Sequence, residues 1–229
     1  MANQLIRETR VDLQLDDVSL EGHLAIPEDP RGIVLFAHGS GSSRHSPRNR
    51  AVARRLQEAR LATLLFDLLT EGEQVADQAS GRFRFDILLL ARRLADTVDA
   101  VTRRWETAGM KIGLFGASTG AAAALIAAAE RTEEVAAIVS RGGRPDLAGE
   151  SLTQVLAPTL LIVGEMDRDV IKLNQVAYEQ LSTEKRLEIV SGATHLFEEP
   201  GALETVADLA TEWFVRYLRP KKSNVSAGI

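Results

Sequence analysis

Apolar and polar residues occur in regular blocks along this chain of 229 residues. Two stretches with loose alternation, residues 5–15 and 18–26, are separated by the pair Asp16-Asp17 and predict an antiparallel hairpin. Later apolar runs are continuous, as expected for strands that are covered on both faces. The later strands are expected at residues 33–37, 61–66, 110–115, 135–139, 158–164 and 186–190.

Helical patterns fall between these strands. The clearest begins at Ile87, because apolar residues then recur at steps of three and four as far as Trp105, and charged residues fill the other face. The run after Gly120 is mostly alanine, which is a strong helix former. The polar stretch 70–84 contains glycines and predicts a loop. Helices are expected at residues 49–60, 87–105, 121–130, 170–181 and 200–217.

The alternation of strands and helices predicts an α/β fold. We expect a mostly parallel eight-stranded sheet with an N-terminal antiparallel hairpin and helices on both faces. Residues 1–219 are expected to form a single domain, and the polar residues 220–229 a frayed tail. Only residues 140–157 separate two of the later strands, which leaves space for a minimal cap and predicts an open, shallow pocket. Ligands bind beyond the carboxyl ends of the strands in such sheets.

Composition narrows the possible functions. Hydrophobic residues make up 45% of the chain and charged residues 26%, which is typical of a soluble globular protein. The net charge of −5 argues against a nucleic-acid or anionic-membrane partner. There are no cysteines, so disulfides and thiolate chemistry are excluded. No signal peptide or apolar run of ~20 residues is visible, and we expect a cytoplasmic protein without a metal or cofactor.

Residues 116–120 read Gly-Ala-Ser-Thr-Gly and lie between an expected strand and the alanine-rich helix. The pattern G-x-S-x-G in this context is typical of a nucleophile elbow, a tight turn that exposes a serine hydroxyl. A plain glycine-serine turn is the alternative, and the pentapeptide alone does not decide between the two. Ser118 is therefore the candidate nucleophile.

A serine nucleophile needs a base and a residue that orients the base. His195 follows the last expected strand, at the sheet edge where Ser118 also lies, and is the candidate base. The acid should follow the preceding strand, where Asp167 is the first choice, Asp169 the second and Glu165 the third. The resulting order Ser-Asp-His is the one found in α/β-hydrolases.

Other candidate site residues lie in neighbouring loops. The oxyanion hole is expected to use the backbone N–H of Thr119 and that of Ser40, with Gly39 as the alternative to Ser40. Arg141 and Arg144 could hold a substrate carboxylate or phosphate, although a surface pair with Asp146 or Glu150 is the more ordinary interpretation. The further candidates are His45 as a pocket residue, Arg44 and Arg48 as anion ligands, His38 as a structural residue, and Asp67, Glu71 and Glu73 as a solvated acidic cluster.

These motifs resemble the α/β-hydrolase superfamily and, within it, the dienelactone-hydrolase-like branch. The resemblance covers residues 33–218 and rests on His38-Gly39, residues 116–120, the turn at 164–169 and residues 192–195. Dienelactone hydrolases proper use a cysteine nucleophile, so a serine esterase is expected instead. We expect cleavage of an ester or related acyl bond in a small molecule. The alternative is a very slow or non-catalytic binding module on the same fold, and the sequence does not indicate an oligomeric state.

Overall fold

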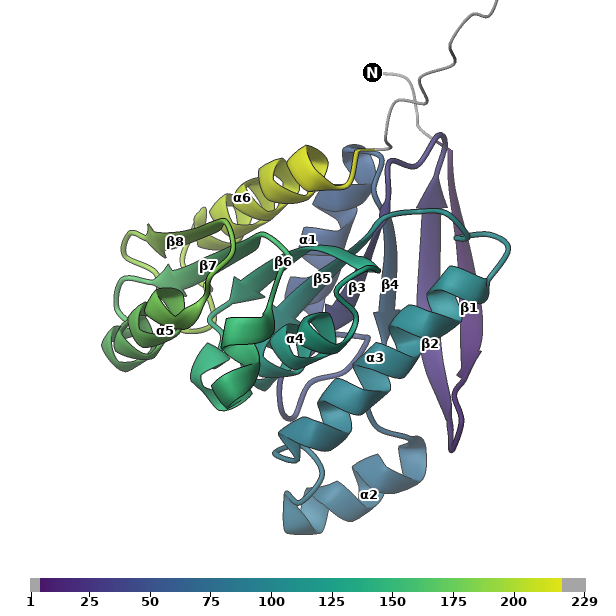
Figure 1. Cartoon of the computed structure of the whole chain (residues 1–229), viewed down its shortest axis with the longest axis horizontal. Helices are drawn as coiled ribbons and strands as arrows, with labels where there is room; N and C mark the ends of the chain where they lie inside the picture. The colour runs from purple at the N-terminus through teal and green to yellow at the C-terminus, as the bar shows by residue number, and fades with distance from the viewer. Residues whose placement is uncertain (1–4, 220–229) are drawn as a thin grey trace, which may run out of the picture.

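The computed structural model describes residues 5–219, so the expected tail at 220–229 lies outside the described residues. One sheet of eight strands has the order β1-β2-β4-β3-β5-β6-β7-β8 (Figure 1). The N-terminal hairpin and its junction with β4 are antiparallel, and every other pair is parallel. The predicted α/β-hydrolase fold is thus confirmed. The strands are β1 (Ile6–Gln14), β2 (Ser19–Pro27), β3 (Ile33–Ala37), β4 (Ala62–Phe66), β5 (Ile112–Ala117), β6 (Val135–Arg141), β7 (Thr159–Gly164) and β8 (Lys185–Val190).

Helices cover both faces of the sheet (Figure 1). Successive side chains of a strand point to opposite faces, so Leu114 and Phe115 of β5 enter two different apolar clusters. The cluster around Phe115 is covered by α1 (Pro47–Glu58) and α6 (Ala202–Tyr217). The cluster around Leu114 is covered by the remaining large helices, α3 (Ile87–Arg103), α4 (Thr119–Glu130) and α5 (Arg168–Gln180).

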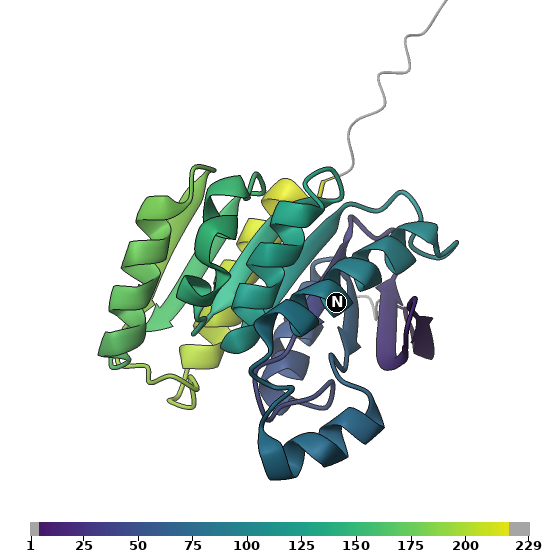
Figure 2. The same ribbon diagram turned by 60° about the horizontal axis from the view of Figure 1, so that its bottom comes forward.

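The expected loop at residues 70–84 is wrong, because its first part forms the helix α2 (Glu71–Ser80). The Thr70 hydroxyl accepts a hydrogen bond from the Glu73 N–H at 3.2 Å, and the Glu73 carboxylate accepts one from the Thr70 N–H at 2.8 Å. This capping box satisfies two N–H groups that a helix start leaves free. Glu73 also binds Arg93 of α3 at 2.9 Å. The helix projects from the body of the sheet in both ribbon views (Figures 1 and 2).

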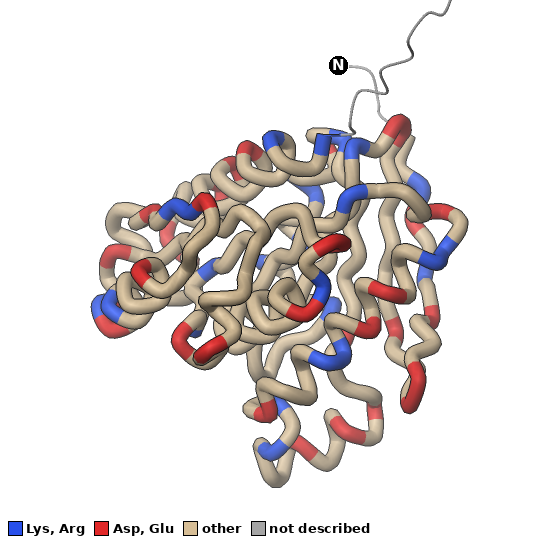
Figure 3. The backbone as a smooth tube through the Cα atoms, in the orientation of Figure 1, with Lys and Arg blue, Asp and Glu red and all other residues tan. Residues whose placement is uncertain are grey.

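The connection between β6 and β7 is short, as expected, but it is more ordered than a loop. Pro145–Gln154 forms 3-10 turns, η1, that contact α4 and α5. On the side shown in Figure 3, acidic and basic residues are interspersed. Among residues 5–219, no helix is both long and apolar enough to cross a membrane.

Candidate active site

The turn between β5 and α4 holds Ser118 in a strained backbone conformation. Its φ is 51° and its ψ is −121°, a region that residues other than glycine rarely adopt. A Cβ atom added to Gly116 would lie 2.4 Å from the Cα of Ala121, and one added to Gly120 would lie 2.2 Å from the backbone oxygen of Ala37. Glycine is therefore required on both sides of Ser118. The serine stays partly exposed at the carboxyl end of the sheet.

His195 and Asp167 meet beyond the ends of β8 and β7. The His195 Nδ1 atom lies 2.6 Å from the Asp167 Oδ2 atom. Asp167 is the residue before α5, yet its side chain makes no helix-capping hydrogen bond. Its carboxylate is therefore free to orient the imidazole. With Nδ1–H donating to Asp167, the lone pair of the neutral ring is on Nε2.

The two other carboxylates considered for this role have different partners. Asp169 is exposed, and its carboxylate lies 3.5 Å from the Lys172 amine. Glu165 accepts hydrogen bonds from the Gly192 N–H at 2.7 Å and from the Ser191 hydroxyl at 3.0 Å. These two bonds lower the pKa of Glu165. Glu165 thereby fastens the start of the loop that carries His195.

A second carboxylate, Glu199, holds the same loop from the other end. It accepts hydrogen bonds from the Thr194 hydroxyl at 2.6 Å and from the Thr194 N–H at 3.1 Å. These bonds lower the pKa of Glu199. The sequence presents Glu165 only as an alternative triad acid and does not indicate Glu199, because nothing in the local pattern links either residue to the histidine loop.

Residues 141–144 connect the serine turn with the histidine loop. The Ser118 N–H donates to the backbone oxygen of Arg141 at 3.3 Å, and the Arg144 N–H donates to the backbone oxygen of Ser118 at 3.1 Å. A Cβ added to Gly142 would lie 3.5 Å from the His195 Cε1 atom. The described contacts include no hydrogen bond between the Ser118 hydroxyl and the His195 ring. Such bonds often form only when substrate is bound.

The candidate oxyanion donors surround Ser118, but one of them already has an acceptor. The Ser40 N–H donates to the Thr119 hydroxyl at 3.0 Å. Thr119 is the first residue of α4, where backbone N–H groups have no helical acceptor. Gly39 packs directly on the nucleophile, since a Cβ at this position would lie 3.0 Å from the Ser118 Cβ. An oxyanion would thus compete with Thr119 Oγ1 for the Ser40 N–H.

The remaining histidines have other environments. The His38 Nε2 atom accepts from the Leu68 N–H at 3.1 Å, so the proton is on Nδ1, which lies 3.0 Å from the Gly39 oxygen. Burial lowers the pKa of His38, and the neutral ring has a structural role. His45 is exposed and packs edge-on against His23, with ring centroids 5.6 Å apart.

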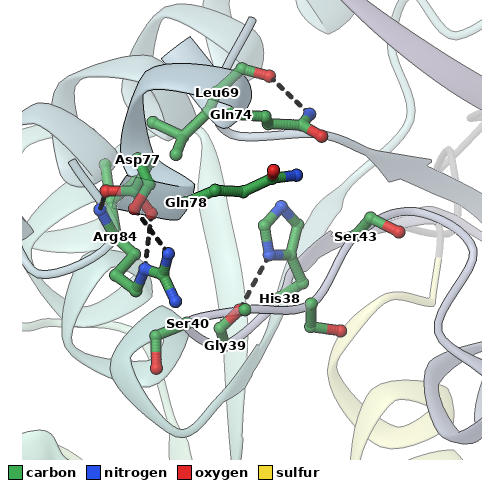
Figure 4. A pocket seen from close by; sticks show the side chains of 12 residues that line it. His38, Gly39, Ser40, Ser43, Leu69, Gln74, Asp77, Gln78 and Arg84 are labelled. Atoms are coloured by element: carbon green, nitrogen blue, oxygen red, sulfur yellow. Dashed lines mark hydrogen bonds and ion pairs between the residues drawn. The ribbon is translucent and has the colours of Figure 1, made fainter. Parts of the chain in front are cut away.

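A cavity of about 360 Å³ opens between the loop after β3 and helix α2. Figure 4 shows Gly39 and Ser40 on one side and Gln74 and Gln78 on the other. Arg84 also lines it and is held by Asp77 at 2.5 Å. Its volume is within the usual range for a small-molecule site. Three of the twelve lining residues, Gln74, Asp77 and Gln78, belong to α2, a segment for which the sequence predicts a loop.

The arginines proposed as anion ligands separate into two groups. Arg44 is bound by Asp67 and Glu21, Arg48 binds Glu198 at 3.0 Å, and Arg144 makes a two-fold contact with Asp146 at 2.8 and 2.9 Å. Arg141 has no such partner within the described part of the chain. The predicted acidic residues do not form one solvated cluster, because Asp67 pairs with Arg44 and Glu73 pairs with Arg93.

Comparison with known proteins gives a family match. A family profile described as an alpha/beta hydrolase domain matches residues 30–213. A crystal structure of dienelactone hydrolase from Anabaena variabilis is 59% identical, with a TM-score of 0.93 over 93% of this chain and 99% of that one. The structure of Est1E from Butyrivibrio proteoclasticus with ferulic acid bound has a TM-score of 0.76 and 17% identity, and the match covers 90% of this chain and 98% of that one. That second likeness concerns the fold alone.

Two curated relatives from strains of Mycobacterium tuberculosis are 55% identical over 217 residues. Both carry the provisional name phosphoribosyl transferase. The match covers 95% of this chain and 48% of each relative, so the chain spans about half the length of these proteins.

Proposed function

Because the chain belongs to the alpha/beta hydrolase domain family, we propose that it is a serine hydrolase that cleaves an ester or related acyl bond. The observation that carries this proposal is the 2.6 Å contact between His195 and Asp167, at the sheet edge where Ser118 occupies its strained turn. A hydroxyl, an imidazole and a carboxylate in these places are the groups that acyl transfer requires.

In the proposed cycle, Ser118 Oγ attacks the acyl carbon while its proton moves to His195 Nε2. Asp167 holds the Nδ1–H and stabilises the imidazolium that forms. Collapse of the tetrahedral intermediate releases the alcohol, which takes its proton from His195. A water molecule then gives a proton to His195 and attacks the acyl-enzyme, which releases the acid and restores the serine.

The developing oxyanion needs two N–H donors. We assign one to Thr119, at the start of α4. The second is the Ser40 N–H, once the oxyanion replaces the Thr119 hydroxyl as its acceptor, or the Gly39 N–H. The cavity next to Ser40 is the natural place for part of the substrate, because the loop that forms its wall also carries these donors.

The proposal covers this chain as one cytoplasmic domain over residues 1–219. The transferase name belongs to proteins about twice as long. The part of each of those proteins that this chain does not match makes up about half of its length.

The test is hydrolysis of 4-nitrophenyl butyrate by the wild type and by Ser118→Ala. We expect the variant to lose activity by roughly a thousandfold or more, with an unchanged circular dichroism spectrum. The exposed Ser182 provides the matched control, since Ser182→Ala should retain full activity. A fluorophosphonate probe should label the wild type at Ser118.

Retained activity in Ser118→Ala would contradict the assignment of the nucleophile. Absence of both turnover and labelling in the folded wild type would instead favour the non-catalytic binding module.

A further inference from the structure

A second cavity, of about 400 Å³, lies between α1 and the N-terminal part of the sheet. Residues of β1, β2 and β4 line one side of it, and residues of α1 line the other. Neither Ser118 nor Asp167 nor His195 belongs to its lining, so it is separate from the proposed catalytic groups. Its volume is within the usual range for a small-molecule site.

The arginines of α1 differ in whether they have a carboxylate partner. Arg48 and Arg55 do not line this cavity, and each lies within 3.0 Å of a carboxylate oxygen. Arg50 and Arg54 line the cavity, are exposed, and have no ion pair among residues 5–219. They are one helical turn apart, a spacing at which like charges destabilise a helix. Helix α1 thus presents two uncompensated positive charges to one cavity.

Two more arginines line the cavity from the other side. Arg10 of β1 binds Glu21 at 2.5 Å, and Arg44 is bound by Glu21 and Asp67. Those two carboxylates compensate these two arginines but not the pair on α1. Glu8 is the only carboxylate among the described residues of the lining. The cavity therefore has an excess of positive charge in a chain whose net charge is −5.

His23 of β2 reports this excess. It lines the cavity, and its Nε2 atom has no hydrogen-bond partner in the described part of the chain. Burial lowers the pKa of His23, and the charges of four neighbours lower it further, those of Arg44, His45, Arg50 and Arg10. The groups around the cavity thus disfavour another positive charge, and the same field favours an anion.

We propose that this cavity binds a phosphate group, as the free ion or as a small phosphate monoester, between Arg50 and Arg54. The site goes beyond the proposed hydrolase function and does not depend on it. Phosphate suits several guanidinium groups better than a carboxylate does, because it has more acceptor oxygens and a higher charge. Gln57 and Thr63, which form a 2.7 Å hydrogen bond in the lining, offer polar atoms to the body of a monoester.

The first test is calorimetric titration with inorganic phosphate and with glycerol 3-phosphate, in chloride buffer at constant ionic strength. We expect the wild type to bind, and Arg50→Gln and Arg54→Gln each to bind roughly ten- to a hundredfold more weakly, the range expected for hydrogen bonds to a charged group. The matched control is Arg55→Gln, which removes the same charge from the same helix and should bind like the wild type, since Arg55 pairs with Asp208.

The tighter of the two ligands identifies the source of the phosphate group. Absence of binding to the folded wild type would overturn the inference. Equal affinities of Arg50→Gln, Arg54→Gln and Arg55→Gln would also overturn it, because the ion would then respond to the overall charge and not to this cavity.

A second readout locates the ion. The chain has four histidines, and the imidazole signal of His23 in a proton NMR titration can be assigned with His23→Gln. Saturating phosphate should raise the pKa of His23, because the bound anion offsets the positive charges around the ring. The rise should be smaller in the double variant Arg50→Gln/Arg54→Gln at the same phosphate concentration. Binding that leaves the pKa of His23 unchanged would assign the ion to another site and overturn the inference.

Discussion

Replacing Arg141 with methionine should stabilise the protein. The substitution keeps most of the apolar length of the side chain and removes the buried charge. Lowering the arginine pKa to about 10 corresponds to about 3 kcal/mol of preference for the neutral form in the folded state. Part of this gain is lost through imperfect packing of methionine. We therefore expect the free energy of unfolding at pH 7 to rise by roughly 1–3 kcal/mol.

The assay is urea unfolding followed by tryptophan fluorescence. Trp213 is 5% exposed and should report the loss of the core, whereas Trp105 is 78% exposed and contributes a smaller change. For a chain of this length, each kcal/mol should also raise the melting temperature by roughly 2–4 °C. The matched control is Arg144→Met, which breaks a partly exposed pair with Asp146 and should lower stability by about 1 kcal/mol or less.

The pH dependence of this effect has a defined sign. The folded state holds the Arg141 proton less tightly than the unfolded state does, so the cost of the charge is fully present at neutral pH. It decreases as the pH rises above about 10, and the advantage of Arg141→Met should decrease with it. A loss of stability in Arg141→Met greater than that in Arg144→Met would refute the reasoning, because it would show that the guanidinium holds the fold together.

Three other substitutions test the elements that position the site. Gly120→Ala would place a Cβ 2.2 Å from a backbone oxygen of β3 and should lower the free energy of unfolding in urea by about 3 kcal/mol or more. The control is Gly72→Ala in α2, where the added Cβ meets open space and should not lower stability. Equal effects of the two substitutions would contradict the strained-turn geometry. Asp167→Asn should lower kcat roughly 10³- to 10⁴-fold, and Asp169→Asn should not; similar losses would reassign the acid. Thr70→Ala should cost about 1 kcal/mol and speed amide exchange in α2 first, and unchanged exchange there would argue against the capping box.

Unfavourable local energies are concentrated around the proposed site. Ser118 adopts a positive φ, and Arg141 is buried without an acceptor two residues before a glycine that approaches Ser140 and Ala121. The apolar clusters on both faces of the sheet supply the stability that holds these groups in place. Substitutions that relieve the backbone strain at Ser118 should therefore stabilise the protein while they reduce its activity.

Local patterns identified most of the framework. The parallel strands and their helices could be predicted because each buried strand is a continuous apolar run, and because α3 has a strict helical repeat. The missed helix α2 shows the limit of this approach. Its capping box, Thr70 to Glu73, is visible in the sequence, but the polar composition and Gly72 favoured a loop. Its contact with Arg93, which lies far along the chain, is part of what holds it in place.

The sequence by itself determined which loops carry chemistry, because strand order and the carboxyl-end rule place Ser118 and His195 at one edge. It left three carboxylates open beside that edge. Only the tertiary structure decided that Asp167 contacts His195, that the Ser40 N–H already has an acceptor in Thr119, and that Arg141 has none among the described residues. These facts depend on distances between residues that are far apart in the chain, and no local pattern of apolar and polar positions encodes such distances.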